Sequence, residues 1–362
     1  MSVPKYVGMF EGKDWLTVQD WSQEELKALI EAAIDLKKKK YNNEPHEYLK
    51  GQTLFMMFYN RSLRTRNSFE AGMFQLGGHA HFLSPTDVYK PVLPGDDEAY
   101  TTERVADVAR VLASYGEGIA IRIYGKHAKW VYGRGHQVIT EFAKYAKRDG
   151  DGKKVPVINM EDDVFHPCQA MADIQALWER YNGKLQGKKF VMSWAYSGSV
   201  EKPLAVPQSS ILIASKFGMD VVLAHPKGFE LDDKIIEWTK KNADQYGGSF
   251  EIVYDMDEAV EGADVIYAKS WGVKKFMKPF VPETDFEKAK ELFEKNKHWI
   301  TTQEKMDKAN KDACYMHCLP ADRNQEVTDE VIDGPQSIVF KEAENRLHAQ
   351  KAIMAAIMGH RE

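Results

Sequence analysis

Short apolar runs alternate with longer amphipathic stretches along most of the chain. The apolar runs are 53–59, 79–83, GIAIRIY, VPVINM, KKFVMSW, MDVVLA, FEIVY, DVIYA and ACYMHC. Helical patterns separate them, among them 21–40, 102–114, 136–147 and 167–181. Alternation of strands and helices is typical of a parallel sheet with helices on both faces. The predicted fold class is therefore α/β.

The alternation runs through the first half of the chain and restarts after the helix predicted at 167–181. A chain of 362 residues is also too long for one ordinary core. We therefore predict two parallel-sheet α/β domains, at 1–165 and 166–342. The closing stretch, 343–362, contains a helical pattern from Ala343 to Met358 and is predicted to return to the first domain.

Composition excludes several classes of protein. A formal net charge of -5 gives no basic face for nucleic acid. The three cysteines cannot form a disulfide framework and lack the spacing of metal ligands. No apolar run approaches a membrane span, and the N-terminus carries no secretory signal. G-x-G-x-x-G, P-loop, G-x-S-x-G and H-E-x-x-H motifs are missing. The prediction is a cytoplasmic protein without membrane partner, metal or cofactor.

The segment RSLRTR, at 61–66, predicts a phosphate site. Ser62, Arg64, Thr65 and Arg66 stand at the start of a predicted helix, directly after the apolar run 53–59. Backbone N–H groups there lack helical partners, and the helix dipole favours an anion. Guanidinium groups add bidentate, charge-assisted hydrogen bonds. The alternative is a capped surface helix with its arginines in solvent.

Other polar segments follow apolar strands, at the edge where parallel sheets bind their ligands. They include Arg122, MEDDVFHPCQ, the segment around Lys269, and MHCLP. Each residue has a plainer alternative when taken singly. Arg122 could be a surface ion-pair partner, His166 a structural histidine, and Cys318 a small buried hydrophobe.

RSLRTR and two of the segments at strand ends, MEDDVFHPCQ and MHCLP, resemble three motifs that occur in the same order in one enzyme family. RSLRTR is similar to the S-T-R-T-R motif of the aspartate/ornithine carbamoyltransferases, HPCQ matches their H-P-x-Q, and HCLP matches the ornithine branch. The resemblance is greatest to the knotted N-acetylornithine/N-succinylornithine carbamoyltransferases, through SWAYSGSVEKPLAVPQSS, YAKSWG and EAENRLHAQKAIM. It implies the carbamoyltransferase fold, with a trefoil knot in the second domain and 197–209 as the knotted loop.

The resemblance also implies a role for each matching residue. Domain 1–165, completed by 343–362, would bind carbamoyl phosphate, and 166–342 would bind the amino-acid substrate. The implied carbamoyl-phosphate ligands are Ser62, Leu63, Arg64, Thr65, Arg66, Arg122, His166, Gln169, Cys318, Leu319 and Arg346. Thr65, Arg122 and His166 would be catalytic, donating to the carbamoyl oxygen as charge builds there. The implied acceptor-binding residues are Glu161, Lys269, Leu319 and Tyr89.

The implied reaction moves a carbamoyl group from carbamoyl phosphate to the side-chain amine of an ornithine-type acceptor. Lys269, a cation, suits a carboxylate better than a free α-ammonium group, which favours an N-acylated ornithine and a place in arginine biosynthesis. The chain departs from the acetyl- and succinyl-specific enzymes at Thr102, Asp322 and Glu326. Ornithine or another diamino acid therefore remains an alternative acceptor. A non-catalytic protein that binds a phosphorylated metabolite remains a second alternative.

A long loop is expected at 84–100, because SPTDVYKPVLPGDDEAY contains three prolines and no periodicity. The resemblance implies a homotrimer in which this loop completes a neighbour's site, with Tyr89 replacing the family's tryptophan. The apolar residues Val88, Tyr89, Val92 and Leu93 support this, because no partner for them is evident within the chain.

Overall fold

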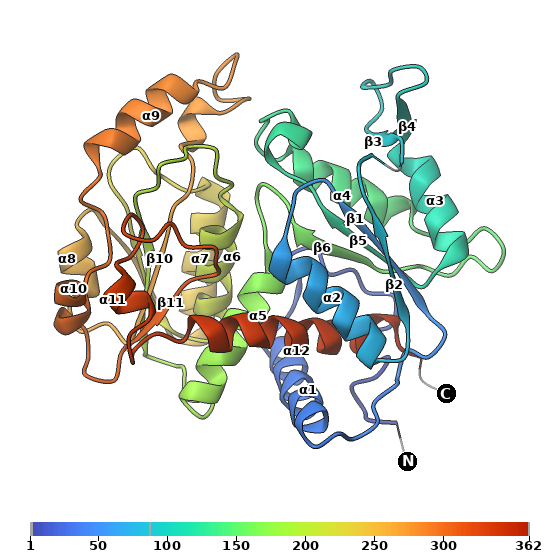
Figure 1. The fold of residues 1–362 in the computed structure, drawn as a ribbon, viewed down its shortest axis with the longest axis horizontal. Coiled ribbons are helices and arrows are strands. Elements are labelled where there is room, and N and C mark those ends of the chain that lie inside the picture. Colours follow the sequence, from blue (N-terminus) through green and yellow to red (C-terminus); the bar gives the residue numbers. More distant parts are fainter. Residues whose placement is uncertain (1–2, 87, 361–362) are drawn as a thin grey trace. The chain divides into compact units, whose positions relative to one another are not determined.

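The computed structural model describes residues 3–86 and 88–360, which form two compact units. Unit 1 comprises the chain up to Lys129, then Gly133–Met171, and the chain from Asn345 onward. Unit 2 comprises Trp130–Tyr132 and Ala172–Glu344. Each unit contains its own parallel sheet, so the predicted fold class of two parallel α/β domains is confirmed (Figure 1).

The sheet of unit 1 has four parallel strands in the order β2-β1-β5-β6. They are β1 (Thr53–Phe58), β2 (His79–Leu83), β5 (Gly118–Arg122) and β6 (Val157–Glu161). The two central strands, β1 and β5, are buried along almost their whole length, as expected where both faces of a parallel sheet are covered. The carboxyl ends of these strands carry the first group of predicted site residues.

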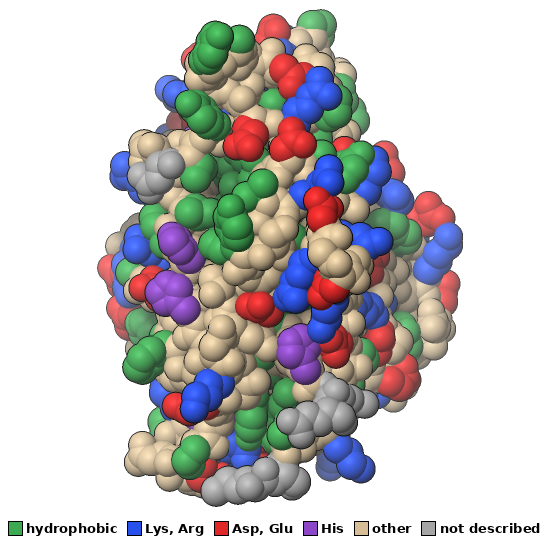
Figure 2. All heavy atoms as spheres, turned by 90° about the vertical axis from the view of Figure 1, so that its right-hand side faces the viewer, with side chains coloured by type: hydrophobic (Ala, Val, Ile, Leu, Met, Phe, Trp, Pro, Cys, Tyr) green, Lys and Arg blue, Asp and Glu red, His purple; other side chains and the backbone are tan. Residues whose placement is uncertain are grey.

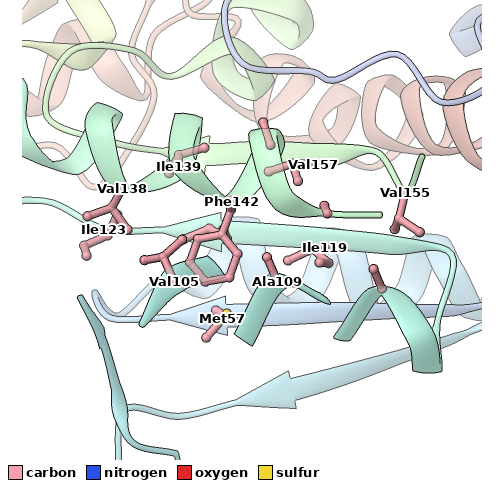
Figure 3. Close-up of a cluster of buried hydrophobic side chains, with 14 of the residues drawn as sticks. Met57, Val105, Ala109, Ile119, Ile123, Val138, Ile139, Phe142, Val155 and Val157 are labelled. Carbon is pink, nitrogen blue, oxygen red and sulfur yellow. The ribbon is translucent and has the colours of Figure 1, made fainter. Parts of the chain in front are cut away.

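Helices cover both faces of this sheet. They are α1 (Gln23–Tyr41), α2 (Leu63–Gln75), α3 (Val105–Tyr115) and α4 (Arg134–Tyr145), with 3-10 turns η1 (Val18–Asp20) and η2 (Gly125–Ala128). On one face, α3 and α4 bury Val105 and Phe142 against Met57 and Ile119 of the sheet (Figure 3). Burying side chains of this size supplies most of the energy that holds a helix to its sheet.

The other face of the sheet packs against α12 (Val339–Met358), which belongs to unit 1 from Asn345 onward. A Cβ added to Gly118 of β5 would lie 2.9 Å from the sulfur of Met358. The helix α2 approaches α12 equally closely at Gly72, where an added Cβ would lie 3.0 Å from Met354. A larger side chain at either position would require the methionine side chain of α12 to shift.

The sheet of unit 2 has five parallel strands in the order β11-β10-β7-β8-β9. They are β7 (Lys189–Trp194), β8 (Asp220–Ala224), β9 (Ser249–Val253), β10 (Val265–Lys269) and β11 (Cys314–Met316). Its helices are α6 (Ala205–Lys216), α7 (Asp233–Tyr246), α8 (Met256–Val260), α9 (Phe286–Lys295), α10 (Gln303–Lys308) and α11 (Asp329–Ile332), with η3 (Lys274–Phe276). The long helix α5 (Pro167–Arg180) begins in unit 1 and ends in unit 2.

The region predicted as an irregular loop at 84–100 is partly ordered. It contains β3 (Lys90–Val92), which pairs in parallel with β4 (Thr102–Arg104). The helix predicted from Thr102 therefore begins only at Val105. Three-residue strands carry too little periodicity to be seen in sequence. Asp87 of this loop lies outside the described residues.

The loop also has intrachain partners that the sequence did not reveal. Val88 and Leu93 pack against the core cluster of unit 1, and Val92 is buried. The expectation that these three residues lack partners within the chain was wrong. Tyr89 alone is largely exposed, at 61%.

Other predicted helices agree with the structure. A capping box between Ser22 and Glu25 begins α1, as predicted. The predicted terminal helix ends at Met358, and residues 361–362 lie outside the described residues. Among the described residues, no helix is both long and apolar enough to cross a membrane.

Candidate active site

The start of α2 is built as the phosphate motif predicts. Ser62 is the N-cap, and its Oγ accepts a hydrogen bond from Thr65 N at 3.1 Å. The first turn of α2, all of it described, carries Arg64 and Arg66 and no acidic residue. Without a carboxylate to neutralise it, this helix end is electropositive and suited to an anion.

Arg346 of α12 reaches this helix end from the far end of the sequence. Its Nη2 donates to Thr65 Oγ1 at 2.8 Å, and its Nη1 donates to Gln169 Oε1 of α5 at 2.6 Å. Arg346, Thr65 and Gln169 are all at most 2% exposed. An arginine side chain stays protonated at physiological pH, so this buried guanidinium can donate charge-assisted hydrogen bonds to an anionic ligand.

A second polar group lies where β5 and β6 end. Arg122 forms an ion pair with Glu161, and Glu161 Oε2 lies 3.4 Å from His166 Nε2. Burial, together with the positive charges of Arg346, Arg122 and Arg64, holds the pKa of His166 well below its usual value. His166 is therefore neutral at physiological pH, and it lies among three guanidinium groups.

Asp162 holds this second group in place and was not predicted from the sequence. Its fully buried carboxylate accepts from Val164 N at 2.7 Å, Phe165 N at 2.6 Å and His136 Nδ1 at 2.8 Å. The first two bonds close the turn between Glu161 and His166. The only signal in the sequence was the doubled acid in MEDDVFH, which also fits a solvated loop.

The HCLP segment of unit 2 forms a tight turn after β11. Leu319 has a positive φ of 53°, and its N–H donates to His317 Nδ1 at 2.9 Å. That bond leaves the ring proton of His317 on Nε2, which lies 3.2 Å from Glu326 Oε2. A left-handed conformation is costly for leucine, so the surrounding contacts must hold the turn. Burial raises the pKa of the Cys318 thiol to about 12, which excludes a thiolate nucleophile at neutral pH.

Lys269, at the end of β10, is paired within the protein. Its Nζ lies 3.0 Å from Glu326 Oε1, and the Glu326 side chain is 0% exposed. Glu326 also accepts from Ser270 N at 2.7 Å and Asp322 N at 2.8 Å. Burial raises the pKa of Glu326, but Lys269 and His317 outweigh burial and hold this pKa well below its usual value. Both groups are therefore charged, and the Lys269 cation already has a counter-ion.

Asp322 adds a more accessible carboxylate beside this pair. It accepts a hydrogen bond from Ser197 Oγ, and its Oδ2 lies 3.1 Å from Lys202 Nζ. The Asp322 side chain is 38% exposed. These contacts join 322–326 to the segment predicted as the knotted loop, although residues 205–209 of that segment already belong to α6. The knot itself stays a prediction.

Most of the site residues predicted for unit 1 lie together in the structure, and a few lie apart from them. Thr65, Arg122, His166, Gln169 and Arg346 lie together in unit 1, and Arg64 is near enough for its charge to act on His166. Glu161 contacts Arg122 and His166 of this group, and its role in binding the acceptor stays a prediction. The side chain of Arg66 stacks on Phe82, 3.7 Å from the ring centre, and pairs with Glu70. Leu63 and Tyr89 are exposed.

Comparison with known proteins identifies the family. Residues 13–179 match the carbamoyl-P binding domain of aspartate/ornithine carbamoyltransferases, and residues 193–357 match their Asp/Orn binding domain. The chain belongs to the aspartate/ornithine carbamoyltransferase family. The predicted family is therefore confirmed.

Relatives within this carbamoyltransferase family include enzymes with different acceptors. The chain is 42% identical to an N-acetylornithine carbamoyltransferase of Xanthomonas campestris pv. campestris, over 96% of this chain and 98% of that one. It is 40% identical to an ornithine carbamoyltransferase of Thermococcus kodakarensis, over 96% and 97%. A crystal structure of acetylornithine transcarbamylase complexed with acetylcitrulline superposes with a TM-score of 0.86 at 41% identity, covering 96% of this chain and 100% of that one.

Proposed function

We propose that this carbamoyltransferase moves the carbamoyl group of carbamoyl phosphate to the side-chain amine of an N-acylated ornithine. The products would be an N-acylcitrulline and phosphate. The observation that carries the proposal is the buried group of unit 1, in which Arg346 joins Thr65 and Gln169 beside a neutral His166. Together with the family assignment, this group supports a site for a phosphorylated carbonyl compound.

Charge supports carbamoyl phosphate as the first ligand. Arg64, Arg122 and Arg346 act together on His166, and Glu161 is a carboxylate paired with Arg122. Three guanidinium groups therefore act at one place in unit 1, and the positive end of the α2 dipole adds to them. Ser62, Leu63, Arg64 and Arg66 would contribute backbone N–H groups, because the side chains of Leu63 and Arg66 lie elsewhere. Guanidinium groups and a helix N-terminus are the groups that bind a dianionic phosphate well.

Catalysis would come from orientation and from donors placed before the reaction begins. The neutral amine attacks the carbamoyl carbon, the bond from that carbon to the phosphate oxygen breaks, and phosphate leaves with the electron pair. Thr65, Arg122 and His166 would stabilise the charge that develops on the carbamoyl oxygen. Phosphate would take the proton that the amine loses. Gln169 and the backbone at Cys318–Leu319 remain the predicted partners of the carbamoyl NH2 group.

The acceptor is proposed to present its α-carboxylate to Lys269. The ammonium group of Lys269 is held in one place by Glu326, and its side chain is still 13% exposed. An N-acyl group would remove the α-ammonium charge that Lys269 would otherwise repel. Glu161 remains a predicted acceptor-binding residue, and its carboxylate also contacts the Arg122 and His166 side chains.

Ornithine itself is a second candidate acceptor, and Asp322 is the observation that favours it. This carboxylate is the more exposed of the two acids near Lys269, at 38% against 0% for Glu326. An α-ammonium group could pair with Asp322 if Lys202 moved aside. The 40% identity to an ornithine carbamoyltransferase also supports ornithine as the acceptor.

A ureido-product assay with carbamoyl phosphate would separate these cases. We expect turnover of N-acetylornithine or N-succinylornithine and little turnover of ornithine. The reverse preference would refute the acylated acceptor and assign the α-ammonium group to Asp322. Binding of carbamoyl phosphate without turnover of any amine would favour a non-catalytic metabolite-binding protein. Replacing Lys269 by methionine removes the charge and should weaken acceptor binding more than carbamoyl phosphate binding.

Three further proposals rest on the family assignment. Residues 1–165 with 343–362 would bind carbamoyl phosphate, and 166–342 would bind the acceptor. The assembly would be a homotrimer in which Tyr89 reaches a neighbouring subunit, and the reaction would serve arginine biosynthesis.

The surface of unit 1 supports an interface between subunits, because the side chains of Leu63, Phe74 and Tyr115 are 70% or more exposed. Apolar and histidine side chains also share one face with charged ones (Figure 2). Light scattering on the purified protein would test the trimer, and a cytoplasmic location stays a prediction.

A further inference from the structure

The first turn of α4 packs against the loop 162–165 of unit 1, and the proposed chemistry uses no residue of that turn. Two neighbouring acids of the loop, Asp162 and Asp163, accept hydrogen bonds from it. Asp163 accepts from Gly133 N, and it also accepts from His136 N at 3.2 Å. Asp162 accepts from His136 Nδ1 at 2.8 Å. His136 therefore contacts both acids, one through its backbone and the other through its side chain.

The backbone of α4 also lies close to this loop. A Cβ added to Gly135 would lie 2.7 Å from Asp163 Oδ1, and it would come closer still to the carbonyl oxygen of Ile123. A backbone carbonyl cannot move aside as the end of a flexible side chain can. A larger residue at Gly135 would therefore force the backbone of α4 or of Ile123 to shift. Glycine permits the close approach that brings His136 to Asp162.

Asp162 joins His136 to the backbone of the loop. Its Oδ1 accepts from Val164 N and Phe165 N, and its Oδ2 accepts from His136 Nδ1 and from Asn159 Nδ2, both at 2.8 Å. The backbone N–H of Asp162 donates to Phe165 O at 2.9 Å. Asp162 is 0% exposed, and His136 forms an ion pair with it. Removing one partner of a buried ion pair is strongly destabilising, so the shape of the loop depends on His136.

The His136 ring is held by packing as well as by its hydrogen bond. It packs edge-on against Phe165, with the ring centres 4.9 Å apart. Burial lowers the pKa of His136, but the carboxylates of Asp162, Asp163 and Asp20 outweigh burial and raise this pKa above its usual value. A carboxylate only accepts hydrogen bonds, so Nδ1 of His136 carries the hydrogen that bonds to Asp162. The charged form of the ring strengthens that bond.

The loop sets the relative positions of Glu161 and His166. It leads from one residue to the other, and Glu161 Oε2 lies 3.4 Å from His166 Nε2. The carbonyl oxygen of His166 accepts from Gln169 N at 3.1 Å and from Ala170 N at 3.2 Å, within the first turn of α5. A change in the shape of 162–165 would therefore move the His166 ring relative to the guanidinium groups that act on it.

We propose that His136 is a positioning residue for His166, and that it acts by holding the Asp162 carboxylate that shapes the loop between them. The inference rests on the proposed function, in which His166 stabilises the charge that develops on the carbamoyl oxygen. That charge develops in the transition state. Loss of the bond between His136 and Asp162 should therefore lower kcat and leave KM for carbamoyl phosphate almost unchanged.

Two substitutions of His136 separate its hydrogen bond from its packing. Asparagine carries an N–H donor on a nitrogen bonded to Cγ, as Nδ1 is, but it has no ring. Phenylalanine keeps a ring against Phe165 but has no donor. We expect His136→Asn to keep kcat within about threefold of wild type and His136→Phe to lower kcat about tenfold or more. The KM for carbamoyl phosphate should change less than about threefold in both variants.

Gln137→Ala is the matched control, because Gln137 is the exposed next residue of α4, and it should behave as wild type. A kcat that is retained by His136→Phe and lost by His136→Asn would assign the ring to packing and overturn the proposal. A change confined to KM, or wild-type kcat in both variants, would overturn it as well.

Titration of the histidine rings by NMR tests the position of His166 without any turnover. Burial and three guanidinium groups hold the pKa of His166 well below its usual value, so its ring should not titrate between about pH 5.5 and pH 8 in the wild type. His136→Phe should raise the pKa of His166 toward about 6.5, and His136→Asn should leave it low. A low pKa of His166 in His136→Phe would overturn the proposal. If this pKa moved as expected while no amine was carbamoylated, the proposed function would fail and the role of His136 would stand.

Discussion

Replacing Glu326 by glutamine is the sharpest test of how unit 2 holds Lys269. Glu326 accepts from Lys269 Nζ and Ser270 N through Oε1, and from Asp322 N through Oε2, which also faces His317. Glutamine has the same shape but only one acceptor oxygen. Its NH2 group must therefore face donors on one side, and the ammonium group of Lys269 loses its counter-ion.

The expected cost follows from burial. The Glu326 side chain is 0% exposed and that of Lys269 is 13% exposed, so little water is available to replace the lost charge. Breaking a buried pair by removing one partner costs about 3–5 kcal/mol. For a cooperative unit of this size, each kcal/mol lowers the Tm by about 2–4 °C, so Glu326→Gln should melt roughly 10 °C below wild type.

Urea unfolding followed by circular dichroism would measure this loss, and a double-mutant cycle would attribute it to the pair. Lys269→Met combined with Glu326→Gln removes both charges and should recover about 2 kcal/mol or more relative to the sum of the single changes. Glu291→Gln, an exposed acid of the same unit, serves as the control. A loss under about 1 kcal/mol for Glu326→Gln, or strict additivity in the double variant, would refute the reasoning. Because folding lowers the pKa of Glu326, its stabilising effect is present above about pH 4.3 and is lost on acidification.

Three further outcomes are expected. Burial and the charge of Asp162 raise the pKa of Asp163 to about 7, so its stabilising effect falls as pH rises from about 4 to 7. The Tm of Asp163→Asn minus that of wild type should rise over that range and then level off, and a constant difference would contradict this. Arg346→Lys replaces the planar fork, whose two nitrogens bond to Gln169 and Thr65, by a single ammonium nitrogen, so calorimetry should show carbamoyl phosphate binding weakened about 10- to 100-fold. Unchanged affinity would remove Arg346 from the site. Ser22→Ala breaks the capping box of α1 and should cost about 1 kcal/mol by thermal denaturation, whereas Ser22→Thr should cost less.

Local sequence determined the regular elements and their chemistry. The helix start at Ser62 and the capping box at Ser22 depend on neighbouring residues only, and the apolar run at 53–59 marked the strand Thr53–Phe58. Strong periodicity and N-cap chemistry act over one or two turns, so they can be read directly. The three-residue strands β3 and β4 could not be read, because pairing between them, rather than local preference, makes them strands.

Residue types at strand ends also indicated most of the buried group in unit 1, but not how its members pair. Arg346 and Thr65 are 281 positions apart in sequence, and nothing local brings them together. The same holds for Glu161: the family resemblance suggested that it binds the acceptor, but nothing in the sequence showed that its carboxylate pairs with Arg122. Long-range partners are set by which helices pack together, and packing depends on the whole core.

The sequence by itself therefore determined the fold class, the phosphate motif at α2 and the family. Only the tertiary structure decided the charge state of the groups involved: His166 is neutral, and Lys269 is paired with Glu326. The reason is physical. Motifs specify which groups a chain carries, whereas burial and the nearest charges, which come from distant parts of the chain, decide how strongly each group holds its proton.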